Sequence, residues 1–170
     1  ALLVIKSLIN GEVLLQIEPI GYFHCRQERP TDSPRQGILA KNSRGQIHLE
    51  ESISTASLRE LEGFERIWLI FSFHKNHKWN PLVKTPRSPI KKGVFATRSP
   101  HRPNFLGMSC VRLVSIQGRM IEVAEHDLLN QTPIFDIKPY LSYADAFPQV
   151  KQGWIDEIKS CSVDASAKAK

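Results

Sequence analysis

The chain has 170 residues, of which 41% are hydrophobic and 24% are charged, and its formal net charge is +6. This length fits one ordinary globular domain, and the balance of apolar and charged residues excludes a disordered chain. The apolar runs are too short to span a bilayer, which excludes a membrane protein. Three widely spaced cysteines make neither a disulfide framework nor a metal knuckle, so a reducing, cytoplasmic location is expected.

The glycines are too scattered to form GxGxxG or GxxxxGK[ST], which excludes the usual Rossmann nucleotide site and the P-loop. The charge is also unevenly spread. No acidic residue lies between Glu65 and Glu122, whereas the same stretch carries eleven Lys and Arg residues with Trp79, Phe95 and Phe105 among them. Phosphate neutralisation and base stacking need this combination, so RNA is the favoured partner. The plain alternative is a solvated basic face over core aromatics.

Short apolar segments separated by Pro, Gly, Asn and Ser predict a β-dominated fold, because helical periodicity is nearly absent. The segment 66–73 is apolar on both faces, which indicates a central buried strand. Gln117 and Gly118 join two of the strands as a tight hairpin. The expected strands are 17–24, 46–49, 66–73, 93–97, 108–116, 119–125 and 134–138.

One short helix is expected at Ser57, because Ser57 and Glu60 have the capping-box spacing and Gly63 supplies a left-handed stop. Residues 76–92 hold three prolines and five positive charges, so we expect a long exposed basic loop. Six or seven strands with so little helix predict an all-β domain, either a small barrel or a sandwich. A metal site at His74 and His77 is not expected, because no cysteine or carboxylate lies in the loop.

The sequence GVFATRSPHRPNFLGMS at residues 93–109 is distinctive rather than merely basic. Together with SPRQ at 33–36, FHKN at 73–76 and DLLNQTPIFDIKPY at 127–140, it closely resembles the TsaA-like family over about residues 17–147. The resemblance implies a small closed β-barrel domain that forms a homodimer. Residues 1–16 are then an N-terminal extension, and residues 148–170 are a C-terminal tail or the start of a truncated C-terminal domain.

The resemblance also implies an activity. Members of the family bind S-adenosylmethionine without a Rossmann fold and methylate N6 of threonylcarbamoyladenosine at position 37, beside the anticodon of threonine tRNAs. The implied cofactor contacts are Pro34, Arg35, Gln36, His74, Lys75, Arg102, Asp127, Leu128, Leu129 and Asn130. For Arg102, a plain structural role that ties its own loop to a carboxylate is the alternative.

Alternation along the strand 134–138 puts Asp136 and Lys138 on one face, with Phe135 and Ile137 pointing into the core. Taken alone, the pair is an ordinary ion pair. The resemblance favours catalysis, in which Asp136 takes the N6 proton. Lys138 then either steers the threonyl carboxylate or tunes Asp136, and Tyr140 stacks on or hydrogen-bonds the base.

Two other functions remain open on the residues alone. One is a metal-independent RNA-cleaving enzyme that uses His74 and His101 as acid and base. The other is a non-catalytic RNA-binding barrel, in which Asp136 and Lys138 form only a salt bridge. All three readings place RNA on the basic segment, with expected contacts at Lys78, Lys84, Arg87, Lys91, Lys92, Arg98 and His101.

Overall fold

The computed structural model of the chain describes residues 8–9, 12–13, 17–29, 40 and 43–158. Two compact units make up the chain. Residues 1–77 and 103–140 belong to the first, which we call the barrel unit, and residues 78–102 and 141–170 to the second, which we call the ribbon unit. No helix in the described ranges is long and apolar enough to cross a membrane.

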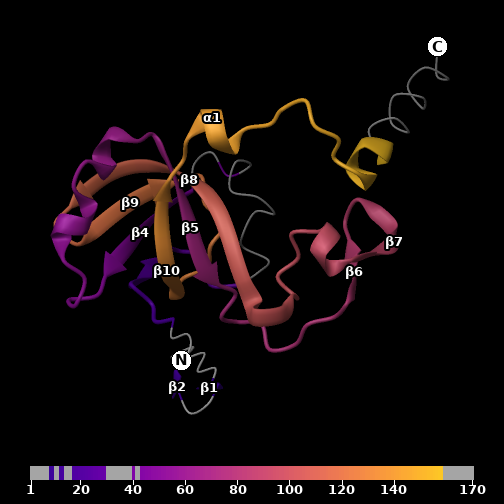
Figure 1. Cartoon of the computed structure of the whole chain (residues 1–170), viewed down its shortest axis with the longest axis horizontal. Helices are drawn as coiled ribbons and strands as arrows, with labels where there is room; N and C mark the ends of the chain where they lie inside the picture. The colour runs from indigo at the N-terminus through magenta and orange to yellow at the C-terminus, as the bar shows by residue number, and fades with distance from the viewer. Residues whose placement is uncertain (1–7, 10–11, 14–16, 30–39, 41–42, 159–170) are drawn as a thin grey trace. The chain divides into compact units, whose positions relative to one another are not determined.

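Six antiparallel strands close the barrel in the order β10-β3-β4-β9-β8-β5 (Figure 1). The bounds are β3 Gly21–His24, β4 Arg44–Leu49, β5 Arg66–Ser72, β8 Leu106–Gln117, β9 Met120–Ala124 and β10 Thr132–Pro139. A separate antiparallel pair, β1 (Leu8–Ile9) with β2 (Glu12–Val13), belongs to the same unit. The all-β class and the closed barrel are therefore confirmed.

Along each strand, every second side chain points into the barrel and fills its interior. Phe23, Ile47, Leu69, Ile121 and Ile134 come from five different strands and are completely buried. In β5, which lies between β8 and β10, the outward residues are half-buried too, as the two-sided apolar pattern predicts. The β8–β9 hairpin also forms as expected, and Gly118 takes a φ of 59° in its turn.

The expected helix at Ser57 is wrong, because the segment forms two short 3-10 turns, η2 (Thr55–Leu58) and η3 (Leu61–Gly63). Ser54 caps the first turn by accepting a hydrogen bond from the Ala56 N–H, and the Ser57 hydroxyl donates to the Ser54 carbonyl instead. Glu60, not Gly63, has the left-handed φ. A segment that buries only Leu58 gains too little from packing to extend into an α-helix.

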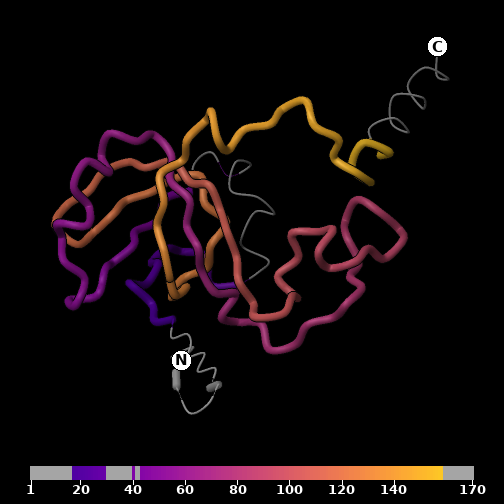
Figure 2. The backbone as a smooth tube through the Cα atoms, in the orientation of Figure 1, coloured from indigo at the N-terminus to yellow at the C-terminus, as the bar shows by residue number. Residues whose placement is uncertain are grey.

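The loop expected at 76–92 is wrong in part, because β6 (Leu82–Thr85) and β7 (Ser88–Gly93) form an antiparallel ribbon there (Figure 2). The strand expected at 93–97 is also wrong, since Val94–Ala96 forms the 3-10 turn η4. Pro89 sits within β7, which a two-stranded ribbon tolerates because each strand has a free edge. The remaining short elements are η5 (Pro103–Phe105), α1 (Ser142–Asp145) and a helical turn at 154–158.

Gly107 in β8 leaves room for the ring of Phe71 on the neighbouring strand, and a Cβ atom at this position would overlap that ring. We therefore expect Gly107→Ala to lower the melting temperature, with a loss of about 1–3 kcal/mol in the free energy of unfolding. Gly63→Ala is the matched control, because a Cβ there meets nothing within 4 Å. Equal melting temperatures of the two variants in a thermal unfolding experiment would contradict this packing.

Candidate functional site

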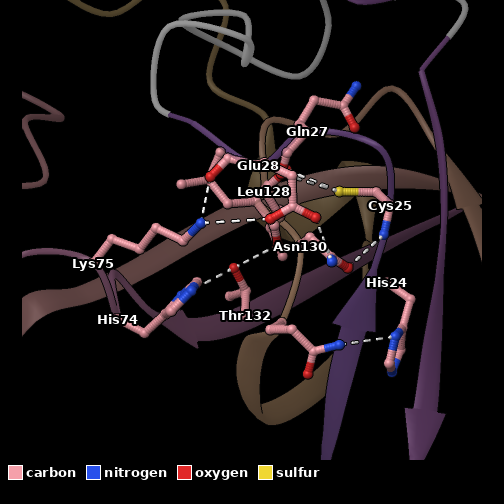
Figure 3. Close-up of polar contacts among 11 residues, drawn as sticks. His24, Cys25, Gln27, Glu28, His74, Lys75, Leu128, Asn130 and Thr132 are labelled. Atoms are coloured by element: carbon pink, nitrogen blue, oxygen red, sulfur yellow. Dashed lines mark hydrogen bonds and ion pairs between the residues drawn. The ribbon is translucent and has the colours of Figure 1, made fainter.

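Polar side chains gather at one rim of the barrel, where three chain segments meet (Figure 3). His74 and Lys75 follow β5, residues 25–28 follow β3, and residues 127–131 lead into β10. Ile134 pairs with both β3 and β5, so the start of β10 lies between the ends of the other two strands. The fold thus brings together residues that the sequence separates widely. We call this group the rim cluster.

Glu28 links the rim cluster electrostatically. The Lys75 ammonium donates to the Glu28 backbone carbonyl and lies 3.7 Å from the Glu28 carboxylate. The Asn130 side-chain amide donates to the same carboxylate at 2.7 Å, and its oxygen accepts from the Cys25 N–H at 3.2 Å. The positive charge of Lys75 is therefore locally balanced, and the amide of Asn130 has a fixed orientation.

His74 is half-buried, and its Nδ1 lies 3.4 Å from the Thr132 hydroxyl. That hydroxyl donates its proton to the Leu129 carbonyl at 2.8 Å, so it would accept from His74 Nδ1–H, leaving Nε2 as an acceptor. Burial, followed by the positive charge of Lys75, lowers the pKa of His74. The ring is therefore neutral at pH 7 and interacts through hydrogen bonds rather than charge.

Two buried polar atoms in the rim cluster have no hydrogen-bond partner among the residues that the structure describes: His74 Nε2 and Gln27 Oε1. Unpaired buried polar groups are costly, so each of these atoms calls for a partner such as a bound water, an ion or a ligand. Gln27 and Glu28 were missed in the sequence, because they belong to none of the distinctive blocks. The only signal was their position directly after the first barrel strand.

The connection before β10 contributes mainly backbone groups. Leu128 has a completely buried side chain, and its carbonyl accepts from the Cys25 thiol. Asp127 accepts from the Ser109 hydroxyl at 2.6 Å. The expected cofactor contacts Pro34, Arg35 and Gln36 lie outside the described residues.

Arg102 belongs to the ribbon unit, where its guanidinium donates to the carbonyls of Thr97 at 3.2 Å and Ser99 at 3.3 Å. It therefore ties its own loop, although to carbonyls and not to a carboxylate. Its assignment to the cofactor site stays a prediction.

Asp136 and Lys138 form an ion pair of 2.8 Å on the outer face of β10, while Phe135 is buried and Ile137 packs against the core. A second Asp136 oxygen accepts from the backbone N–H of Ile137 at 2.9 Å. The ring of Tyr140 lies 5.9 Å from that of Trp68. The Asp136 side chain remains 43% exposed, so a substrate can reach it.

Asp136 also borders an open hollow of about 450 Å³ between β10 and the two 3-10 turns. Apolar residues such as Leu49, Leu58 and Ile137 line it, together with the charged Arg59 and Glu60. Asp136 follows the rim residue Thr132 by four positions, which is roughly 13 Å along a strand. Within one chain, the rim cluster and the Asp136–Lys138 pair therefore lie at different places on the barrel.

The residues expected to bind RNA all lie in the ribbon unit. Lys84, Arg87 and Arg98 are exposed, and no acidic residue occurs between Lys78 and Arg102. Lys92 is half-buried, with its ammonium 5.4 Å from the centre of the Trp154 ring. The described part of the chain contains no group of three side chains that could hold a metal ion.

Comparisons with known proteins agree with this geometry. Residues 22–146 match the family model of the tRNA-methyltransferase O N-terminal domain. A Pyrococcus abyssi protein named "Probable S-adenosyl-L-methionine-binding protein" is 37% identical over 145 residues, which is 85% of this chain and 78% of that protein. The tRNA (adenine(37)-N6)-methyltransferase of Rattus norvegicus is 38% identical over 146 residues, which is 82% of this chain.

The crystal structure of TrmO from Pseudomonas aeruginosa superposes with a TM-score of 0.72 at 36% identity and covers 84% of this chain. This chain spans 63% of the Pseudomonas chain and 33% of the rat enzyme. Because the family model covers most of the chain and the barrel matches a solved member of similar sequence, this chain belongs to the tRNA-methyltransferase O N-terminal domain family.

Proposed function

We propose that the chain is an S-adenosylmethionine-dependent tRNA methyltransferase that acts on N6 of adenosine 37. The observation that carries this proposal is that the chain belongs to this family and is 38% identical to an enzyme named for that reaction. The rim cluster supports it independently, because a barrel without a glycine-rich phosphate loop still offers a group of buried, unsatisfied polar atoms. A cytoplasmic location remains part of the proposal.

The rim cluster fits the cofactor chemically. S-adenosylmethionine, when bound, supplies a methyl group from a positively charged sulfonium. The described residues that would hold it are His74, Gln27 and the Asn130 segment, which offer hydrogen-bond acceptors and donors rather than a strong charge. Because Glu28 already balances Lys75, the cluster is close to neutral and does not repel a sulfonium.

The finer substrate that we propose is threonylcarbamoyladenosine in threonine-accepting tRNA. The N6 lone pair of a carbamoylated adenosine is delocalised, so a base that removes the N6 proton is useful. Asp136 is exposed enough to serve as this base, and Lys138 beside it is suited to bind the threonyl carboxylate. Tyr140, next to Trp68, would position the base.

We also propose that the protein acts as a homodimer. The outer face of β8 leaves Met108 59% and Leu106 36% exposed, and Met108 pairs with the half-buried Ile70 of β5. A second copy on this apolar face would remove these side chains from water. Since the rim cluster and Asp136 are separated within one chain, two copies can complete a site that one chain holds only in parts.

The direct test is methyl transfer from labelled S-adenosylmethionine to purified tRNA, with the modified nucleoside identified by mass spectrometry. We expect incorporation at adenosine 37 of threonine tRNA that carries the threonylcarbamoyl group, and none in the unmodified transcript. Shortened RNA instead of methylated RNA would support the RNA-cleaving alternative. Binding of tRNA with neither reaction would support a non-catalytic barrel.

His74→Ala is expected to weaken the binding of S-adenosylmethionine by about 1–3 kcal/mol, because it removes a buried hydrogen-bonding group. Calorimetry measures this, with His77→Ala as the control because His77 is an exposed histidine nearby. The pKa of His74 is lowered from its ordinary value of 6.5, so the ring is neutral at pH values above 6.5. The affinity should therefore be constant from pH 8 to 6.5 and fall only at lower pH. Unchanged affinity of His74→Ala would remove His74 from the site.

Asp136→Asn is expected to preserve the fold and both binding steps but to lower the methyl-transfer rate by roughly 10²-fold or more, the usual contribution of a positioned base. Single-turnover assays with saturating cofactor and tRNA measure this step. Asp156→Asn is the control, since Asp156 is an exposed carboxylate of the ribbon unit that accepts a single backbone N–H at 2.7 Å.

The substitution also frees Lys138, so the double variant Asp136→Asn, Lys138→Met must be measured beside it. A normal rate in the single variant would make Asp136 a structural partner of Lys138 and nothing more.

A further inference from the structure

The ribbon unit exposes two aromatic rings on its basic segment, residues 78–102. Phe95 is 79% exposed and Trp79 is 49% exposed, although both belong to residue types that usually pack inside. The third aromatic residue of the segment in sequence, Phe105, is half-buried and belongs to the barrel unit. Only two of the three aromatics named from the sequence are therefore presented to solvent on the ribbon unit.

The turn η4 fixes Phe95 in this exposed position. Its first residue, Val94, is 2% exposed, and Phe95 follows directly. Successive residues of a 3-10 turn are rotated by about 120°, so the burial of Val94 orients Phe95 outward. The Val94 carbonyl accepts from the Thr97 N–H and hydroxyl, and the Ala96 carbonyl accepts from the Trp154 indole at 2.9 Å.

Phe95 is thus carried by a backbone whose two flanking carbonyls are both held. Arg102 adds to this by binding the carbonyls of Thr97 and Ser99. A ring on such a backbone loses little conformational entropy when a ligand contacts it.

Trp79 and Phe95 extend from the same end of the ribbon. Leu82 pairs with Gly93, Trp79 precedes this pair by three residues, and Phe95 follows it by two. The Val94 N–H donates to the Pro81 carbonyl at 2.9 Å, which holds the two flanking segments together. The two chain segments that carry the rings are therefore neighbours within one unit.

The chain segment that carries the rings is basic. Lys78 and Arg98 flank them in the chain, Lys84 and Lys91 lie on the ribbon, and no acidic residue occurs between positions 78 and 102. Two aromatic rings that packed against an apolar protein surface or inserted into a membrane interior would not need these positive charges. A ligand that offers flat rings and many negative charges fits both features.

We propose that Phe95 and Trp79 stack on unpaired bases of single-stranded RNA while the surrounding lysines and arginines contact its phosphates. This inference rests on the proposed function and deepens it, because it names the RNA feature that the ribbon unit recognises. An unpaired base has an exposed ring face, whereas the bases of a duplex are already stacked on each other. The ribbon unit therefore selects loops over helices.

The experiment measures the affinity of the full chain for a fluorescein-labelled single-stranded RNA and for a duplex of the same length, over a series of salt concentrations. Base stacking on an aromatic residue is worth about 1–3 kcal/mol, which corresponds to about 5- to 150-fold in affinity. We expect Phe95→Ala to weaken single-strand binding by this factor at every salt concentration, and to leave duplex binding unchanged. Phe95→Tyr should restore it.

Two control variants distinguish base stacking from charge attraction and from the general effect of removing an exposed aromatic ring. The double variant Lys84→Ala, Arg87→Ala should lower the salt dependence, because fewer counterions are released on binding, whereas Phe95→Ala should not. Phe147→Ala removes a phenyl ring that is 66% exposed in the same unit but outside the basic segment, and it should have no effect.

Unchanged single-strand affinity of Phe95→Ala overturns the proposal, and so does an equal loss for the duplex. A change in oligomeric state of Phe95→Ala in light scattering also overturns it, because the ring would then cover a second copy of the chain. These outcomes leave methylation of tRNA by the unaltered chain intact. Failure of the proposed function would instead appear as the absence of methyl transfer in the unaltered chain.

Discussion

Closure of the barrel by β10 is the constraint on which the rest of the barrel unit depends. Residues Thr132–Ile134 pair with β3, and Ile134–Pro139 pair with β5, with a shift of register between Ile134 and Asp136. Such an irregularity bends the strand and increases its local twist, which helps a small sheet to curl into a closed barrel. The closed sheet has no free edge, and it holds the connection before β10 against the ends of β3 and β5. The rim cluster exists because of this closure.

The barrel could be predicted from the sequence because each of its strands has one face that must be apolar. Ile47 and Leu49 alternate with polar residues in β4, and Leu69 lies in a run that is apolar on both faces. A register shift of one residue would move these side chains from the core to the solvent-facing side of the sheet. The pattern therefore determines both the strand and its inward face. The distinctive blocks added His74 and Asn130, which proved to lie in the same cluster.

The remainder depended on contacts that leave no periodic signal. The Glu28 carboxylate accepts a hydrogen bond from Asn130, which is 102 positions away in the sequence. No local sequence pattern predicts such a long-range pair. The three prolines at 81, 86 and 89 favoured a loop over a strand in this segment. A two-stranded ribbon tolerates proline, however, because each of its strands has an edge without a partner strand. The Ser57 capping box competed with an equally good acceptor at Ser54 three residues earlier, and the short turn used Ser54.

The two units differ in the kind of ligand that their electrostatics admit. In the rim cluster, His74 is neutral and Lys75 is balanced by Glu28, so recognition there depends on the direction of hydrogen bonds. In the ribbon unit, the segment 78–102 carries lysines and arginines and no carboxylate of its own, so it attracts a polyanion over about a Debye length, whatever the sequence of that polyanion. A small ligand with a positive sulfonium would be repelled by the ribbon segment and accepted by the rim. A nucleic acid has the opposite preference, so one chain can bind both ligands without competition between them.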